Sequence, residues 1–266
     1  MPRFDPHPVI RPTVITGASS GIGAATARAL AELGHPVALG ARRLEECEAV
    51  AHTIREKGGV AFVHRLDVTD PDSVDEFVTA AEQELGVIEI LVSAAGAMRF
   101  GLAHEMSPAD FVRQLDVHLA GPQRMLHRIV PGMIERQRGD VALIGSDCAV
   151  SPRPRMGAYN AAKAGLEALS IQLRMELEGT GVRVSMVRPG PTATEMGLDA
   201  PAEVIDDLIA DWSAWGFARH PYQLRAADMA AAVTTAVAAP RGAHVIVSEV
   251  QPEAPLRKPA ADTSQS

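Results

Sequence analysis

Cysteine and positive charge are both scarce in this chain of 266 residues. Its 2 cysteines, Cys47 and Cys148, lie far apart and belong to no CxxC or histidine-rich spacing. The sequence therefore indicates neither a disulfide framework nor a metal site, and we expect two free thiols. The net charge of −8 argues against a nucleic-acid surface, because such a surface needs concentrated Lys and Arg to displace counterions.

Long apolar runs are also missing. No run approaches the roughly 20 residues that a membrane-spanning helix needs. The first residues, MPRFDPHPVIRP, carry prolines and an acid where a signal peptide would have an apolar stretch. We therefore expect a cytoplasmic protein without a membrane partner.

What is present is the composition of a folded domain, with 47% hydrophobic and 22% charged residues. Short runs of β-branched and aliphatic residues alternate with segments in which apolar residues recur at helical spacing. This strict alternation predicts a mainly parallel sheet with helices on both faces. The predicted strands span residues 12–16, 36–41, 60–68, 87–96, 140–146, 182–190 and 243–250.

The expected architecture is one doubly wound α/β domain of the Rossmann type, with a seven-stranded parallel sheet, over residues 10–250. Residues 1–9 and 251–266 are rich in Pro, Ala and small polar residues, and we expect them to be flexible unless they dock. The strand–helix pattern breaks after the sixth strand. Residues 195–224 could form a lid there, because ligands bind beyond the carboxyl ends of parallel strands.

The segment TGASSGIG, Thr16 to Gly23, follows the first predicted strand and opens the first predicted helix. Gly17, Gly21 and Gly23 allow a tight turn, a close approach of the backbone to a pyrophosphate, and close packing of the helix on the strand. The N–H groups and the dipole of that helix favour an anion. With about twenty residues to the end of the next strand, the segment is typical of a dinucleotide-binding loop.

The end of the second predicted strand bears on which dinucleotide binds. A protein that prefers NAD usually has Asp or Glu there to hold the ribose hydroxyls, whereas this chain reads GARR, with no acid before Glu45. Arg42 could pair with the 2′-phosphate of NADP, so the sequence favours NADP(H), with NAD(H) as the alternative. The plainer interpretation is that Arg42 and Arg43 simply start a solvated helix. Asp67, after the third strand, would lie near the adenine or would simply precede a helix.

The segment AYNAAKAG places Tyr159 and Lys163 four residues apart on a predicted helix, and so on one face. A phenol has an ordinary pKa near 10, which is too high for easy proton exchange at neutral pH. We expect the lysine ammonium to lower the pKa of Tyr159, so that the pair can act as a general acid or base. Alone, this spacing also arises by accident on helix surfaces.

Ser146 follows the fifth strand, thirteen residues before Tyr159. With TGASSGIG, Ser146, YNAAK and RPGPTAT in this order, the chain resembles the short-chain dehydrogenase/reductase family over about residues 10–250. The resemblance implies hydride transfer between a nicotinamide ring and the carbonyl or secondary-alcohol carbon of a small organic substrate. Metal ions play no part in this chemistry.

The resemblance also implies individual roles. Ser146 would hydrogen-bond the substrate oxygen, Tyr159 would transfer its proton, and Lys163 would tune Tyr159 and bind the nicotinamide ribose. The implied cofactor-binding residues are Gly17, Ser19, Ser20, Gly21, Ile22, Gly23, Arg42, Asp67, Val68, Ala94, Ala95, Gly96, Tyr159, Lys163, Pro189, Gly190, Thr192 and Thr194.

Two departures from the family pattern stand out. The family usually has Asn-Asn-Ala-Gly after the fourth strand, where this chain has Ser93, Ala94, Ala95 and Gly96. In many members a helix asparagine that holds a relay water occupies the position of His118 in QLDVHLAG. His118 could replace that asparagine as a fourth catalytic residue, bind the water less well, or be a hydrogen-bonded core residue without a catalytic part.

Other features leave alternatives open. Residues 151–156, Arg99 and the aromatic side chains of Trp212, Trp215 and Phe217 could line a pocket for a substrate with an anionic end. We expect instead that the arginines are solvated and that the aromatic residues pack the lid. The resemblance implies a homodimer or tetramer. A rival reading is a cofactor-binding regulator that keeps the fold without turnover, although such a sensor would not need Ser146, Tyr159 and Lys163 together.

Overall fold

The computed structural model describes residues 5–197, 199–217 and 220–256. Seven strands form one parallel sheet in the order β3-β2-β1-β4-β5-β6-β9, which confirms the predicted doubly wound fold. The strands are β1 (Thr13–Thr16), β2 (Val37–Ala41), β3 (Ala61–Arg65), β4 (Ile90–Ser93), β5 (Gly139–Ile144), β6 (Val182–Pro189) and β9 (Val247–Val250). Most strands are shorter than the apolar runs that predicted them. The runs continue past the end of the strand, where the residues are still buried but no longer pair in the sheet.

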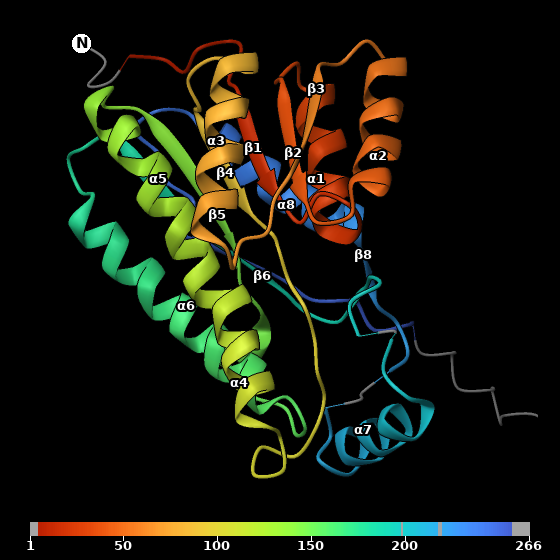
Figure 1. The fold of residues 1–266 in the computed structure, drawn as a ribbon. Helices are drawn as coiled ribbons and strands as arrows, with labels where there is room; N and C mark the ends of the chain where they lie inside the picture. The colour runs from red at the N-terminus through yellow and green to blue at the C-terminus, as the bar shows by residue number, and fades with distance from the viewer. Residues whose placement is uncertain (1–4, 198, 218–219, 257–266) are drawn as a thin grey trace, which may run out of the picture.

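Helices cover both faces of the sheet (Figure 1). One face carries α1 (Gly21–Glu32), α2 (Leu44–Glu56) and α8 (Ala226–Ala238), and the other carries α3 (Pro71–Leu85), α5 (Gly121–Glu135) and α6 (Gly157–Glu176). Successive strand side chains point to opposite faces. Val92 therefore packs in the α1 and α8 layer, whereas its neighbour Leu91 packs in the α3 and α5 layer.

The order of strands reverses direction between β1 and β4, and this is where parallel sheets of this type open a crevice for a ligand. The connection after β4 leads to α4 (Pro108–Leu115), which runs through a π-helical turn, η1 (Asp116–Ala120), into α5. The sequence predicted a helix here but not the π turn. Such turns occur often at functional sites, and this one contains His118.

Buried charges tie the chain together at the amino-terminal edge of the sheet. Asp140, at the start of β5, pairs with both Arg11 and Arg183, and all three are almost fully buried. Arg183 Nη2 also donates a hydrogen bond to His7 Nε2, over 2.8 Å. Part of the amino-terminal segment that was expected to be flexible is therefore docked. Residues 1–4 of that segment, like residues 257–266 of the expected carboxyl-terminal tail, lie outside the described residues.

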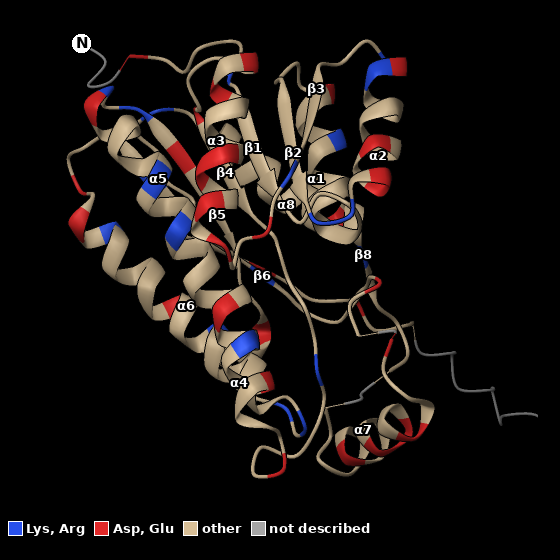
Figure 2. Ribbon diagram, in the orientation of Figure 1, with Lys and Arg blue, Asp and Glu red and all other residues tan. Residues whose placement is uncertain are grey.

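The expected lid region, residues 195–224, contains α7 (Ala202–Ala214), and it is followed by β8 (Leu224–Arg225), which pairs with β7 (Thr192–Ala193). In Figure 1, α7 lies beyond the carboxyl ends of the strands and apart from the sheet. Figure 2 shows acidic residues, in red, and no basic ones on this helix. Arg155 holds it by pairing with Asp207 and Asp211, over 3.1 and 2.6 Å. None of the described helices is long and apolar enough to cross a membrane.

Candidate active site

The glycine loop lies at the crevice between β1 and β4. Gly17 has a φ of +67°, and a Cβ on it would lie 2.7 Å from the Cα of Ala95. The hydroxyl of Thr16 accepts hydrogen bonds from the backbone N–H groups of Ala94 and Ala95, each over 3.0 Å. Thr16 therefore joins the ends of the two strands. The sequence prediction named the loop but did not give Thr16 this role, which depends on its pairing with a segment 78 residues away.

The start of α1 is available to an anion. Ser20 is the N-cap residue of this helix, but its side chain makes no capping hydrogen bond. The first N–H groups of the helix are therefore not satisfied by that side chain. Ser19, Ser20 and Thr194 line a cavity of about 690 Å³ here, together with the charged residues Arg28 and Glu195. This geometry suits the pyrophosphate of a dinucleotide, as the sequence predicted for Gly21 and Thr194.

The two arginines of GARR point to different places. Arg43 donates to the hydroxyls of Ser19 and Ser20, over 3.1 and 2.8 Å, and pairs with Glu195 over 3.0 Å. It therefore links the glycine loop to the start of the lid region. Arg42 instead lines a second cavity, of about 580 Å³. The sequence prediction missed Arg43 and Glu195, because the contact joins positions that are 152 residues apart.

Asp67 and Val68 follow β3 at the same edge of the sheet. Asp67 accepts hydrogen bonds from the backbone and the hydroxyl of Thr69, over 3.0 and 2.7 Å. Although burial acts in the opposite direction, these bonds hold the pKa of Asp67 below its usual value. The side chain of Val68 packs on Gly121, where an added Cβ would lie 2.8 Å from it. Val68 thus fixes this loop against the start of α5.

The remaining predicted cofactor residues surround the same crevice. Ile22 packs on the core at the start of α1, and Gly23 packs so closely on Gly17 that a Cβ would lie 2.3 Å from its carbonyl oxygen. Gly190, after Pro189 at the end of β6, donates its N–H to Val250 over 2.8 Å. Gly96 faces the ring of His118, and Thr192 lies in β7.

Ser146, Tyr159 and Lys163 are all buried, and the structure brings them together. Tyr159 and Lys163 lie one turn apart on α6, with the lysine Nζ 5.6 Å from the centre of the tyrosine ring. Ser146 follows β5, where its hydroxyl accepts a hydrogen bond from the backbone N–H of Cys148 over 3.1 Å. It also lies close enough to Tyr159 to hydrogen-bond it. This is the grouping that the sequence motifs predicted.

The expected lowering of the tyrosine pKa is wrong for this structure. Burial raises the pKa of Tyr159 above its usual value, and hydrogen bonding with Ser146 offsets only part of this effect. The phenol therefore keeps its proton at neutral pH. A group in this state can donate a proton to a substrate oxygen, which is what carbonyl reduction requires.

Lys163 is charged and buried, yet it has few partners. Its Nζ donates to the carbonyl oxygen of Ile144 over 2.7 Å, and burial lowers its pKa to about 8. An ammonium group has three N–H donors, and a buried charge is costly unless they are used. Only one hydrogen bond from this group to another described residue is present. The remaining donors could hold the hydroxyls of a ribose.

His118 is buried in η1, with its ring edge-on to Tyr159 and the two ring centres 5.0 Å apart. Its Nε2 lies 2.6 Å from the carbonyl oxygen of Ala97, so this nitrogen carries the proton and donates it. Burial, followed by the charge of Lys163, lowers the pKa of His118 to about 3. The imidazole is therefore neutral at physiological pH. Its Nδ1 is an acceptor without a hydrogen-bond donor among the described residues.

Replacing His118 with asparagine is expected to leave turnover at or above the wild-type level near neutral pH. An amide supplies both an N–H donor and an acceptor, as the neutral imidazole does, and a group with a pKa of about 3 contributes no protonation step between pH 5 and 8. Steady-state rates across this pH range test the expectation. A collapse of turnover in the folded variant would show that the imidazole itself is needed.

The matched control is His118→Leu. This variant leaves the Ala97 carbonyl without its donor, and we expect it to lower the free energy of unfolding by about 1–3 kcal/mol. Equal unfolding midpoints for His118→Asn and His118→Leu would argue against the hydrogen bond that the structure assigns to His118.

An apolar cluster surrounds the ring of Tyr159. Its buried members are Met98, Cys148, Met156 and Tyr159, and Trp212 of α7 packs against them. Trp212 of the expected lid region thus packs against this cluster, whereas Trp215 is exposed. Burial raises the pKa of Cys148, so its side chain is a thiol and not a reactive thiolate.

Arg153 borders this cluster and is not solvated, which corrects the sequence prediction. It is nearly buried, pairs with Asp147 over 2.5 Å, and lies 5.5 Å from the centre of the Trp212 ring. Although burial opposes ionisation, the hydrogen bond with Arg153 holds the pKa of Asp147 below its usual value. By contrast, Arg99 is exposed and pairs with Asp199, as expected for a solvated side chain.

A glycine loop at the switch point of a seven-stranded parallel sheet, with helices on both faces, defines a domain of the Rossmann type. Comparison with known proteins agrees. A family model described as short chain dehydrogenase matches residues 11–204. Glycine betaine reductase of Emericella nidulans is 43% identical over 193 residues, which are 72% of this chain but only 15% of that protein.

Two further comparisons cover most of both proteins. The 2,3-dihydro-2,3-dihydroxybenzoate dehydrogenase of Bacillus subtilis is 35% identical over 68% of this chain and 70% of its own length. The solved alcohol dehydrogenase of the archaeon Thermococcus sibiricus, complexed with 5-hydroxy-NADP, is 29% identical with a TM-score of 0.79, over 93% of this chain and 100% of that one. The chain belongs to the short chain dehydrogenase family, whose members are oxidoreductases acting on CH–OH and C=O groups.

Proposed function

We propose that this protein is an NADP(H)-dependent oxidoreductase that interconverts a carbonyl group and the matching secondary alcohol of a small organic substrate. The observation that carries the proposal is the buried group of Ser146, Tyr159 and Lys163 beside the glycine loop. The bound cofactor would supply or accept the hydride. The substrate carbon would lie between the nicotinamide and the hydroxyl of Tyr159.

Each residue of the group has a distinct task in this proposal. The hydroxyl of Ser146 positions the substrate oxygen, and the phenol of Tyr159 donates its proton as negative charge develops there. Lys163 holds the ribose hydroxyls with the donors that Ile144 leaves free. Because burial raises the pKa of Tyr159, the phenol carries its proton at neutral pH, as the proton donor of carbonyl reduction must.

The lid and the substrate follow from the same geometry. We propose that residues 195–224 cover the substrate, with Trp212 over the apolar cluster and Arg155 holding α7 in place. The apolar wall suits a substrate with an apolar body. Asp147 neutralises Arg153 within the site, so an anionic substrate end gains less there than the isolated arginine would suggest.

For NADP over NAD, the support is the exposed Arg42 at the end of β2 and the absence of an acid beside it. The Arg42→Ala variant should bind NADPH about 10- to 100-fold more weakly, since a charge-assisted contact with a phosphate contributes about 1.5–3 kcal/mol. Binding of NADH should change less than about threefold on the same reasoning. Titration of each dinucleotide by fluorescence or calorimetry measures both constants.

The control for this measurement is Arg128→Ala. It removes the same charge from the surface between α3 and α5, where Arg128 pairs with Asp75 and Glu82. We expect it to change neither constant. Equal losses of NADPH and NADH binding in Arg42→Ala would contradict the NADP preference and favour an NAD-linked dehydrogenase. Tight binding without turnover of any carbonyl would favour the non-catalytic regulator.

A further inference from the structure

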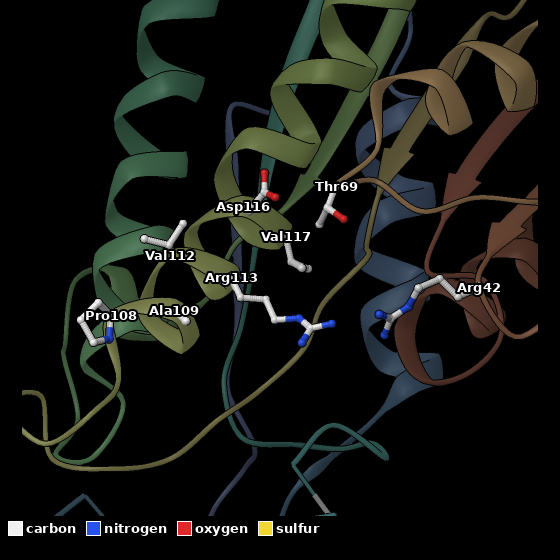
Figure 3. A pocket seen from close by; sticks show the side chains of 8 residues that line it. All are labelled: Arg42, Thr69, Pro108, Ala109, Val112, Arg113, Asp116 and Val117. Atoms are coloured by element: carbon white, nitrogen blue, oxygen red, sulfur yellow. The ribbon is translucent and has the colours of Figure 1, made fainter.

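The cavity that Arg42 lines is built by three segments that are far apart in the sequence. Its volume is about 580 Å³, and its walls come from the end of β2, the loop after β3, and the α4 to η1 helix. Figure 3 shows the side chains of Arg42 and Arg113 reaching into it from opposite sides, with their guanidinium groups turned toward one another. The lining residues are Arg42, Thr69, Pro108, Ala109, Val112, Arg113, Asp116 and Val117.

The positive charge of this cavity is not balanced by its own carboxylates. Asp116 is the acid on the wall, and Arg124 holds it over 2.7 Å. Asp67 lies near enough to Arg42 to feel its charge, but its carboxylate accepts its hydrogen bonds from Thr69. Within the described ranges, neither Arg42 nor Arg113 forms an ion pair or a side-chain hydrogen bond. Two guanidinium groups that converge without such partners favour an anion between them.

The position of the cavity in the fold indicates which anion would bind between the two arginines. It adjoins Asp67 and Val68, beside which the adenine of the proposed cofactor would lie, and Val117 precedes His118 in η1. The methyl groups of Thr69 and Val117 offer apolar contacts for a base. The adenosine end of the dinucleotide would thus enter this cavity with its 2′-phosphate between the two arginines.

We propose that Arg113 is a second determinant of cofactor specificity, which holds the 2′-phosphate of NADP(H) from the side opposite Arg42. The inference rests on the proposed function and adds a residue from α4 to the site. Arg113 has no recognisable motif around it, and it shares a cavity with Arg42 only because the fold brings the α4 to η1 segment to the same hollow as the end of β2. The residue contributes to binding, so its loss should leave the chemistry at Tyr159 unchanged.

The test compares ligands that differ only in the phosphate. In Arg113→Ala, we expect the dissociation constants of NADPH and of 2′,5′-ADP to rise about 5- to 30-fold, as for the loss of one charge-assisted contact. Those of NADH and ADP should change less than about twofold. Arg113→Lys should retain part of the affinity, because it keeps the charge but not the planar fork. Circular dichroism confirms that each variant is folded, and Arg128→Ala is the control for the loss of a surface charge.

The outcomes separate this inference from the proposed function. If Arg42→Ala loses its preference for NADPH while Arg113→Ala keeps it, Arg113 has no part in specificity and the NADP assignment stands. If Arg113→Ala weakens the binding of all four ligands equally, Arg113 only maintains the structure of the cavity, and the inference is overturned. If the wild-type protein binds NADH as tightly as NADPH, both the inference and the cofactor assignment fail.

Discussion

The Tyr159→Phe variant is expected to reduce a carbonyl substrate about 10²- to 10⁴-fold more slowly than the wild type, because the substitution removes the proton donor of the reaction. The hydroxyl is buried with a raised pKa, so it is protonated at neutral pH. No water can readily replace it within the apolar cluster that surrounds it. Binding of NADPH should weaken far less than turnover, because Lys163 and the glycine loop remain.

The measurement is the loss of NADPH absorbance with a panel of ketones and aldehydes, together with a separate NADPH titration. Tyr222→Phe is the matched control, since Tyr222 is the other tyrosine of the chain and is exposed. It should behave as the wild type does. If Tyr159→Phe kept its rate within a few-fold, another group would be the proton donor. If it weakened NADPH binding as strongly as turnover, Tyr159 would act in cofactor binding instead of proton transfer.

The Asp140→Ala variant is expected to lower the free energy of unfolding by about 3–5 kcal/mol, which is the typical cost of breaking a buried charge pair. Asp140 neutralises both Arg11 and Arg183, and its own side chain is 3% exposed. Without it, two buried guanidinium groups lose their counter-charge. Arg183 also donates to the carbonyl oxygens of Ala239 and Ala243, over 2.9 and 2.6 Å, so the loss should loosen the connection between α8 and β9.

Urea unfolding at a fixed protein concentration measures the change, because any oligomer would make stability depend on concentration. Asp75→Ala is the control: it removes a carboxylate that is 69% exposed and pairs with Arg128. We expect it to cost no more than about 1 kcal/mol, as is usual for a surface ion pair. Equal effects of the two substitutions would show that the charge network at the edge of the sheet does not stabilise the fold.

The fold could be predicted because its signals are local. Buried strands such as VALGA and ILVS consist almost entirely of apolar and small residues, and amphipathic helices follow them at regular intervals. The ends of the strands could not be predicted in this way. Residues 87–96 were predicted as one strand, but only Ile90–Ser93 pair in the sheet, since apolar composition does not mark where the ladder of hydrogen bonds ends. The π turn at His118 had no signal of its own.

Some residues of the candidate site could be predicted from the sequence and others could not. Gly17, Ser146, Tyr159 and Lys163 could be named from the sequence, because their motifs have fixed spacings and each follows a strand or lies on one helix. The sequence places Arg43 only at the start of a helix and does not predict its contacts, since its partners Ser19, Ser20 and Glu195 come from two other segments. No local pattern encodes such contacts.

The sequence by itself determined the parallel sheet, the glycine loop and the order of the reacting residues, all of which depend on neighbours within a few positions along the chain. The tertiary structure alone decided the protonation states of the site. Burial raises the pKa of Tyr159, lowers that of Lys163 to about 8 and lowers that of His118 to about 3. The tertiary structure also decided that Arg42 and Arg113 share a cavity and that Asp147 neutralises Arg153. Both outcomes depend on which segments exclude water from a side chain, and this is settled only when distant parts of the chain pack together.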